Sequence, residues 1–462
     1  MPAMPTPKTC FRFFLSNVLF FLGISCAGAG PSPRPNVIIV VVDALRADYL
    51  GSYGFKGGSS SFIDRFASES VQFDRCLSPA PWTKPAVASL FTSLHPETHG
   101  LIYPTMADNK PVFNNPLPPA AVTMAEIFKS NGYRTVAFNS NAWLAPESGL
   151  MRGFDETHFA DRLLIPDMVN AWVSTAATAA PLFLYVHFLD VHGHYMFDAT
   201  DFDQMKAQLM RQPGANDGFD NTNLVWYMKV TFNDNEKEKS VLNWRAAYAG
   251  AVKRFDTIFE KFRESLDAVG LLDNSIVIFT SDHGENLLQH RFLEHGDTLF
   301  IEELHVPLLV RFPNKRMAGR RIEDTVSLVD LLPTLSDLCH LKARSATWQG
   351  HSLLPVVRGE GRSGRTVYSA GVKEHPEVAS AFSGNYHLIS PGDGRSPLLF
   401  NILDDPFERT DIAAREPAIT SRLLADLKRH VELQRKLKII GSDVAPMSEE
   451  MKEQLRSLGY LH

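Results

Sequence analysis

The sequence has few cysteines, no excess of positive charge and, after its N-terminus, no long apolar run. Only four cysteines occur in 462 residues, and two of them, Cys10 and Cys26, lie in the N-terminal segment. The others, Cys76 and Cys339, are too few for a disulfide scaffold, and we expect both to be buried small apolar residues. The net charge of −6 argues against a nucleic-acid binder. The missing apolar runs predict no membrane span beyond the N-terminus.

The N-terminal segment has the order of a secretory signal. Lys8 and Arg12 precede the apolar run 13–22, and small residues follow it. We therefore expect an exported protein, periplasmic if the source is bacterial, with an uncleaved anchor helix as the alternative. The segment 22–26 also resembles a bacterial lipoprotein signal, with its apolar residue one place too far from Cys26. Lipidation of Cys26 would anchor the chain to a membrane of the cell envelope, and both outcomes stay open.

Strand-like and helix-like segments alternate between residues 36 and about 313. Apolar, β-branched runs predict strands, and amphipathic segments between them predict helices. The alternation is typical of an α/β fold with a mainly parallel central sheet and helices on both faces. The expected strands are 37–42, 134–138, 182–188, 275–280 and 306–311, and the expected helices lie near 61–69, 85–93, 121–131, 245–267 and 327–339.

The pattern changes near residue 366, which predicts a second and smaller unit. Short strand-like runs are followed by a charged helix, and this order suits a small C-terminal α+β subdomain. The runs are 366–370, 377–381, 386–389 and 398–401, and the helix is 415–436. The polar stretch 196–243 has little periodicity, so we expect a loop or short helices over the active edge. Four segments result: a signal peptide at 1–26, a linker at 27–35, a catalytic domain at 36–365 and the subdomain at 366–462.

Two of the predicted strands end in acidic residues. Asp43 follows the run 37–42, and Asp282 and His283 follow the run 275–280. Open α/β folds place their ligands at the carboxyl edge of the sheet, where such side chains meet. These residues therefore suggest one metal site assembled from distant parts of the chain.

Thr83 precedes a predicted helix. Pro81 and Pro85 constrain the turn around it, and the run from Ala86 has a helical pattern. Backbone N–H groups and the helix dipole favour an anion at such a position. A hydroxyl between a cation and this anion site is a candidate nucleophile, because the cation lowers its pKa. The alternative is that Thr83 is only an N-cap, which is the commoner role of such a threonine.

Several motifs rich in Asp, His and Glu follow one another in a fixed order. They are Asp43–Asp48, Ala80–Pro85, His187–Tyr195, Ser281–Glu285, Glu294–Gly296 and Glu302–Leu308, with Asn139–Asn141 before Arg152–Asp155 and the ending Leu458–Leu461. In this order they resemble the sulfatase family of the alkaline phosphatase superfamily, from Asn36 to the C-terminus. The resemblance implies an alkaline-phosphatase-like fold and hydrolysis of sulfuric ester bonds or related anionic esters.

The resemblance also assigns roles to individual residues. It implies that Asp43, Asp282 and His283, together with the hydroxyl of Thr83, bind one divalent metal, and these ligand types suit Ca²⁺, Mn²⁺ or Zn²⁺. The histidines that would protonate the leaving group or bind the oxygens of the substrate are His187, His192 and His295. Arg46, Lys84 and Asn141 are the candidates for substrate binding, and a surface salt bridge is the alternative role of Arg46 and Lys84.

The nucleophile position departs from the usual family pattern. Typical sulfatases carry Cys or Ser in Cys-x-Pro-x-Arg and convert it to formylglycine, whereas this chain has Thr83 at that position and Val87 at the Arg position. Formylglycine is therefore not expected. Ala44 also stands where these enzymes place a second Asp. A threonine nucleophile resembles the phosphodiesterase and phosphotransferase branches of the superfamily, in which it attacks phosphorus directly.

A second metal is an alternative to the single site. Asp190, His194 and His295 match the second-metal pattern of the two-metal branches, where a second cation would help to neutralise a phosphate dianion. In the competing interpretation, His187 and His192 protonate the leaving group or bind the substrate, and His194 merely follows them in sequence.

Three functions are consistent with these residues. The first is a metal-dependent hydrolase of sulfuric esters with a Thr nucleophile, acting on a small anionic ester or on a sulfated or phosphorylated glycan. The second is a phosphodiesterase, phosphomonoesterase or phospho-headgroup transferase of the same superfamily. The third is a catalytically inactive, sulfatase-like binding protein. The presence of all four residues Asp43, Thr83, Asp282 and His283 argues against this last function.

Overall fold

The computed structural model describes residues 34–103, 105–107, 110–112, 115–176, 180–193, 195–211, 234–343, 347–361, 364–439 and 453. The predicted signal peptide at 1–26 and nearly all of the linker at 27–35 lie outside the described residues. From Arg34 onward the chain forms one unit by its internal contacts. Among the helices that the structure describes, none is long and apolar enough to cross a membrane.

Eight strands form the central sheet, in the order β12-β2-β11-β8-β1-β7-β5-β6. Neighbouring strands are parallel except at β11, which is antiparallel to both β8 and β2. The predicted α/β class with a mainly parallel sheet is therefore confirmed. The strands are β1 (Asn36–Val42), β2 (Val71–Leu77), β5 (Arg134–Asn139), β6 (Glu156–Phe159), β7 (Leu182–Phe188), β8 (Ser275–Thr280), β11 (His305–Arg311) and β12 (Arg321–Ser327).

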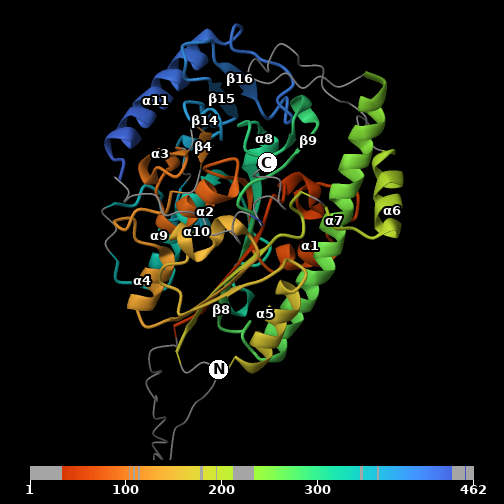
Figure 1. Ribbon diagram of the computed structural model, residues 1–462, viewed down its shortest axis with the longest axis vertical. Helices are drawn as coiled ribbons and strands as arrows, with labels where there is room; N and C mark the ends of the chain where they lie inside the picture. Colours follow the sequence, from red (N-terminus) through yellow and green to blue (C-terminus); the bar gives the residue numbers. More distant parts are fainter. Residues whose placement is uncertain are drawn as a thin grey trace, which may run out of the picture. The chain divides into compact units, whose positions relative to one another are not determined.

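Helices cover both faces of this sheet (Figure 1). Alternate residues of a strand point to opposite faces, and β1 follows this rule. Val37, Ile39 and Val41 pack in the core under α2, α4 and α9, whereas Ile38 and Val40 pack in the core under α1, α5 and α7. These helices are α1 (Ser61–Ser68), α2 (Thr83–Thr92), α4 (Met124–Ser130), α5 (Ile165–Thr175), α7 (Asp234–Ala268) and α9 (Leu331–Leu338).

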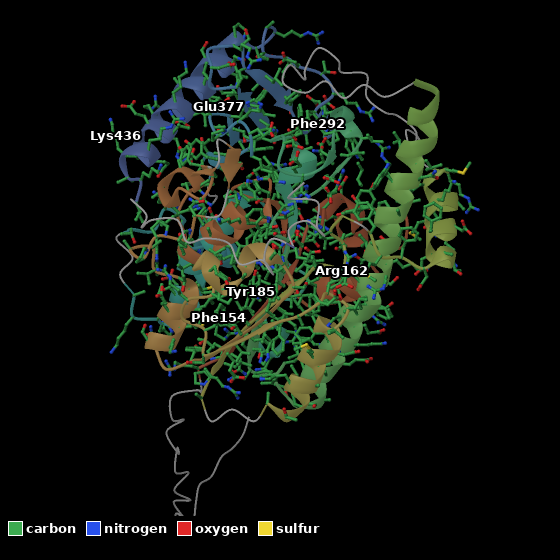
Figure 2. All side chains as sticks on the ribbon, in the orientation of Figure 1. Phe154, Arg162, Tyr185, Phe292, Glu377 and Lys436 are labelled. Atoms are coloured by element: carbon green, nitrogen blue, oxygen red, sulfur yellow. The ribbon has the colours of Figure 1, made fainter. Side chains whose placement is uncertain are left out.

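Aromatic side chains fill much of the core below α2. Tyr185 of β7 is fully buried, and its ring packs against Phe91 of α2 and against Phe154, at centroid distances of 4.8 and 6.2 Å. Figure 2 shows Tyr185 and Phe154 near each other in the interior, and Lys436 at the outer end of α11. Cys76 and Cys339 are also buried in this core as free thiols, as expected.

The C-terminal region forms a four-stranded antiparallel sheet with one long helix, which confirms the predicted small subdomain. The strands are β13 (Val367–Ala370), β14 (Ala379–Ser383), β15 (Tyr386–Ser390) and β16 (Leu398–Asn401), and the helix is α11 (Pro417–Lys436). One face of this sheet packs on Leu423 and Leu427 of α11. Phe382 and Phe400 on the other face pack with Phe292 and Leu304, which belong to the part of the chain that contains the eight-stranded sheet.

The remaining described elements are short connections between these layers. They are α3 (Pro96–His99), α6 (Ala199–Leu209), α8 (Ile301–Leu304), α10 (Leu354–Arg358), β3 (Thr105–Ala107), β4 (Lys110–Val112), β9 (Asn286–Leu287) and β10 (Leu293–Glu294), with short 3-10 turns such as Ala47–Tyr49, Gly51–Tyr53 and Ala142–Leu144. The stretch 196–243 contains α6 and the first turns of α7, and its middle part, 212–233, lies outside the described residues.

Candidate active site

The tips of four adjacent strands supply most of the polar residues of the site. Val41 of β1 pairs with His187 of β7 on one side and with Thr280 of β8 on the other, so these strands end together. Asp43 therefore lies between His187 and the Asp282–His283 pair. The fourth strand, β5, is in register with β7, and Asn141 follows its last residue. All of these side chains are buried.

Asp43, Asp282 and His283 form a group that fits a metal ion. One ligand atom from each lies within 4.8 Å of the other two, and this is the one such group among the described residues. Asp43 Oδ1 and Asp282 Oδ2 are buried and accept no hydrogen bond. Two buried carboxylate oxygens without donors are costly unless a cation lies between them. Burial raises the pKa of Asp282, and repulsion by the negative charge of Asp43 raises it further.

His283 has the hydrogen bonding expected of a metal ligand. Its Nδ1 lies 2.8 Å from the carbonyl oxygen of Gly284, so the proton of the neutral ring sits on Nδ1. Nε2 then carries a lone pair, and it lies 3.4 Å from Asp43 Oδ1 and 3.6 Å from Asp282 Oδ2. A backbone carbonyl that fixes the tautomer in this way is the usual partner of a ligating histidine. The residues present therefore fit a divalent cation held by oxygen and nitrogen.

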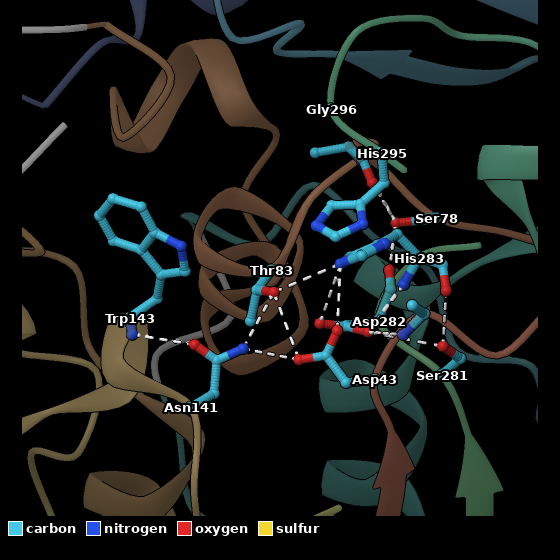
Figure 3. Close-up of polar contacts among 12 residues, drawn as sticks. Asp43, Ser78, Thr83, Asn141, Trp143, Ser281, Asp282, His283, His295 and Gly296 are labelled. Atoms are coloured by element: carbon cyan, nitrogen blue, oxygen red, sulfur yellow. Dashed lines mark hydrogen bonds and ion pairs between the residues drawn. The ribbon is translucent and has the colours of Figure 1, made fainter. Parts of the chain in front are cut away.

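Thr83 is the first residue of α2 and points into this group (Figure 3). Its Oγ1 lies 3.3 Å from Nε2 of His283 and 3.4 Å from Oδ2 of Asp43. Trp82 occupies the N-cap position, so Thr83 is not the N-cap. The helix also begins two residues before the predicted range of 85–93, because Pro85 is compatible with the first turn of a helix. The hydroxyl thus lies between the candidate metal ligands and the N-terminus of a helix.

Asn141 connects the nucleophile position to the metal group. Its Nδ2 donates to Asp43 Oδ2 at 2.6 Å and to Thr83 Oγ1 at 3.2 Å, and its Oδ1 accepts from the backbone N–H of Trp143 at 2.9 Å. The amide is therefore fixed at both ends. Since its donor occupies a lone pair of the Thr83 oxygen, the hydroxyl proton is directed towards Asp43 or His283.

His187 is held between two partners. Its Nε2 lies 2.9 Å from Asp43 Oδ2, and its Nδ1 lies 2.7 Å from the hydroxyl of Tyr185. Burial alone would lower the pKa of His187, but the hydrogen bond with Asp43 and its charge raise it. Burial would likewise raise the pKa of Asp43, yet the surrounding His192, His187 and His283 hold it well below its usual value. Both ring nitrogens of His187 are thus engaged within the protein.

His192 and His295 lie above the metal group with closely packed rings. The centroid of the His295 ring is 4.8 Å from that of His192 and 4.3 Å from that of His283. Burial lowers the pKa of His192 to about 4. Burial also lowers the pKa of His295, and the neighbouring His283 and Lys373 lower it further.

Other candidate residues lie outside this cluster. The guanidinium of Arg46 is buried and engaged: it pairs with Asp48 at 2.7 and 2.9 Å and donates to the carbonyl oxygen of Glu285 at 3.0 Å. Asp190 pairs with Arg254 at 2.5 Å, and His194 lies outside the described residues. The members of the alternative two-metal set are therefore not brought together among the described residues.

Two cations flank the nucleophile position. Lys84 is buried with its ammonium 5.4 Å from the ring centroid of Trp143, and burial lowers the pKa of Lys84 to about 7. Lys373 comes from the loop after β13 in the C-terminal subdomain. Its ammonium donates to the carbonyl oxygen of His295 at 3.1 Å and lies 5.8 Å from the ring centroid of Trp82.

Sequence reasoning missed Lys373 and gave no role to Glu285. Glu285 is fully buried, and its Oε1 accepts from Nδ1 of His295 at 3.1 Å. The sequence could have indicated a role for Glu285, because it lies two residues after His283 in the Ser281–Glu285 motif. Lys373 stands in no motif, and only the packing of the C-terminal sheet on the catalytic part brings it to the site.

The alkaline-phosphatase-like sheet and the site at its carboxyl edge define a class of hydrolases that act on sulfate and phosphate esters. Within this class the chain belongs to the sulfatase family, because the family model "Sulfatase" matches residues 35–341. The model "N-sulphoglucosamine sulphohydrolase, C-terminal" matches residues 289–435. Members of the sulfatase family hydrolyse sulfate esters, and the expected enzyme class is confirmed.

Several similar proteins match most of the chain at low identity. A Delta 4,5-hexuronate-2-O-sulfatase of Bacteroides thetaiotaomicron is 24% identical, over 88% of this chain and 89% of its own. The structure of a phosphonate monoester hydrolase of Agrobacterium radiobacter has a TM-score of 0.68 at 20% identity, covering 87% of this chain and 96% of its own. That of a 2-O GAG sulfatase has a TM-score of 0.66 at 20% identity, covering 88% and 95%.

Proposed function

We propose that this protein is a metal-dependent sulfatase that uses Thr83 as its nucleophile and acts on sulfated acidic saccharides. The observation that carries this proposal is the position of Thr83 Oγ1, which lies within 3.4 Å of both Asp43 and His283. Asp43, Asp282 and His283, together with the Thr83 oxygen, would hold one divalent cation. When bound, such a cation neutralises charge on the sulfate and lowers the pKa of the hydroxyl.

The residues around Thr83 prepare its oxygen for attack. Asn141 holds the oxygen by donating to it, and Asp43, whose Oδ2 lies 3.4 Å from the hydroxyl oxygen, takes the hydroxyl proton. The Thr83 oxygen then forms a bond to sulfur as the bond between sulfur and the ester oxygen breaks. Water attacks the resulting sulfo-threonine in a second step, which releases sulfate and restores the hydroxyl. Burial of the site excludes other water from the first step.

The departing alcohol oxygen needs a proton, and His192 or His295 would supply it once the negative charge of the bound substrate has raised the pKa that burial lowers in the free protein. His187 is a poor donor, because Asp43 and Tyr185 engage both of its ring nitrogens. Lys84 and Lys373 are the cations placed to bind further anionic oxygens of the substrate. The names of two relatives, a hexuronate-2-O-sulfatase and a 2-O GAG sulfatase, support a sulfated uronate as the substrate class.

Hydrolysis of a phosphoester or phosphonate ester is the second candidate. Thr83 favours it, since a threonine cannot become formylglycine in the usual pattern and can attack phosphorus directly. A phosphonate monoester hydrolase among the structural neighbours is consistent with this chemistry. Sulfate and phosphate esters have the same tetrahedral anionic geometry, so kinetics must decide between them.

Metal content and turnover, measured on the same preparation, test the proposal. We expect one metal per chain by elemental analysis, turnover of an aryl or 2-O-uronate sulfate, and loss of that turnover in Thr83→Ala but not in Thr83→Ser. Faster turnover of aryl phosphate mono- or diesters would favour the second candidate. Bound metal without turnover of any of these esters, or no metal at all, would favour an inactive binding protein.

We also propose that the chain is exported, as residues 1–26 predict. Expression of the full chain with its native N-terminus, followed by fractionation and N-terminal mass analysis, tests this proposal. Cleavage near residue 26 is the expected result, and a diacylglycerol adduct on Cys26 would establish a lipid anchor. An intact N-terminus in the cytosolic fraction would contradict export.

A further inference from the structure

A cavity of about 570 Å³ lies apart from the nucleophile. Its lining includes residues of the turns after β1, Arg245 of α7, Glu302 of α8 and the loop after β16. These elements are separate in sequence and bring the catalytic part and the C-terminal subdomain together (Figure 1). Thr83 and the Asp43, Asp282 and His283 side chains do not line it. Its volume is within the range of roughly 300–1,000 Å³ that small-molecule sites occupy.

The wall between this cavity and the active site is a hydrogen-bonded layer. Arg46 lines the cavity, and its Nη1 donates to the carbonyl oxygen of Glu285 at 3.0 Å and to Gln289 at 3.1 Å. Glu285 in turn binds His295 at the active site. A ligand in the cavity therefore contacts one side of this layer, and the reacting groups lie on the other.

The charges that line the cavity favour an anion. Its lining contains two carboxylates, and each already has a basic partner. Asp48 pairs with both nitrogens of the Arg46 fork, and Glu302 lies 2.6 Å from Nδ1 of His290. Three further cations, Lys56, Arg245 and Arg409, come from three different parts of the chain. Four basic side chains and two carboxylates therefore line the cavity, and the summed charge of its lining is positive.

The lining also offers flat apolar surfaces. The rings of Tyr53, Phe55 and Phe407 line the cavity, and Phe407 is 40% exposed. The guanidinium carbon of Arg409 lies 5.5 Å from the ring centroid of Phe407. Sugars bind aromatic faces through their C–H groups, and their acidic substituents bind Lys and Arg. Inorganic anions, in contrast, use only the cations.

We propose that this cavity is a second, non-catalytic binding site for an acidic saccharide. Lys56 and Arg409 bind its sulfate or carboxylate, and its ring lies against Phe407. The site holds a saccharide that the catalytic residues do not touch, and it goes beyond the hydrolysis proposed above. Since the assay requires no turnover, its outcome is independent of whether Thr83 is a nucleophile.

Protection of Lys56 from an amine-reactive reagent tests the proposal on the full chain. The Thr83→Ala variant is labelled with and without a sulfated uronate–hexosamine disaccharide, its unsulfated form or inorganic sulfate, and the modified lysines are mapped by mass spectrometry. Lys436, whose side chain is 70% exposed at the far end of α11, is the internal control. We expect the sulfated disaccharide to protect Lys56 several-fold and to leave Lys436 unchanged.

A matched variant tests the second cation. Arg409→Ala should raise the disaccharide concentration that half-protects Lys56 by roughly tenfold, because one charge-assisted bond is lost. Arg65→Ala, which removes a guanidinium of 67% exposure paired with Glu260 elsewhere, should leave that concentration unchanged. Equal labelling of Lys56 with and without disaccharide, or equal protection in Arg409→Ala, would overturn the proposal. Protection by inorganic sulfate at the same concentration as by disaccharide would also overturn it, as the rings would then contribute nothing.

Discussion

Replacing Asp282 with asparagine should stabilise the protein without metal and destabilise it with metal. Asp282 and Asp43 are both fully buried, and Oδ2 of Asp282 accepts no hydrogen bond. The asparagine amide keeps the size of the side chain and removes its charge. Its Oδ1 still accepts from the backbone N–H groups of Ala44 and His283, which bond Oδ1 of the native carboxylate at 3.3 and 2.9 Å.

The magnitude follows from the group that is removed. A buried acceptor without a partner costs about 1–3 kcal/mol, and a charged one more. The metal-free variant should therefore gain about that much in free energy of unfolding, which is a rise of a few degrees in Tm. A metal at about a thousand times its Kd stabilises the wild type by roughly 4 kcal/mol. Asparagine is a weaker ligand than aspartate, so the variant should lose most of that stabilisation.

Calorimetric melting with a chelator and with saturating Ca²⁺, Mn²⁺ or Zn²⁺ measures both effects. Asp330→Asn is the matched control, since Asp330 is equally buried but accepts from the N–H groups of Ser327 and His351 at 2.9 Å and pairs with Arg365. This control should lower Tm in both conditions. If Asp282→Asn also lowered Tm in chelator, the two carboxylates would not be held in repulsion, and the argument for a metal at this group would fail.

Three further predictions follow from other contacts. Glu285→Gln should slow hydrolysis of alkyl sulfates by roughly 10–100-fold more than that of 4-nitrophenyl sulfate, because only the alkyl alcohol, the poorer leaving group, needs a proton from an oriented His295. An equal loss on both substrates would contradict this role. Lys373→Ala should raise KM for sulfated disaccharides more than it lowers kcat, whereas Lys436→Ala should change neither. Burial raises the pKa of Asp256 to about 6, so the folded chain binds this proton more tightly than the unfolded chain does. The free energy of unfolding should therefore fall by up to about 3 kcal/mol as pH rises from about 4 to 6. Asp256→Asn should abolish that part of the pH dependence in urea unfolding, and an unchanged slope would refute it.

The sequence was sufficient for the centre of the sheet. The predicted strands at 37–42, 182–188 and 275–280 match β1, β7 and β8 within one residue. These strands are buried on both faces, so they read as unbroken apolar runs. Because parallel strands end at one edge, the acidic residues that follow them could be placed together from sequence alone.

The outer strands, and the positions of the Arg46 and Lys373 side chains, were not predictable in this way. β2 and β12 contain polar residues such as Asp74 and Glu323, since strands away from the centre are partly exposed, and their apolar pattern is therefore weak. The direction of the Arg46 side chain depends on Asp48, two residues away, and on the carbonyl oxygen of Glu285, and only the fold brings this carbonyl to it. Lys373 reaches the site through packing of a separate sheet, and no local pattern records that contact.

The arrival of Lys373 from the C-terminal subdomain has a consequence for the order of synthesis. Asp43 and Thr83 leave the ribosome early, whereas Lys373, with the strand β13 that positions it, is made only after most of the chain. Chains fold during synthesis from the N-terminus, so a nascent or truncated chain would present the nucleophile without this cation and without the hydrogen bond that holds the backbone of His295. A chain that ends before Lys373 therefore carries the nucleophile in an incomplete substrate-binding site, and it should bind sulfated substrates more weakly than the full chain.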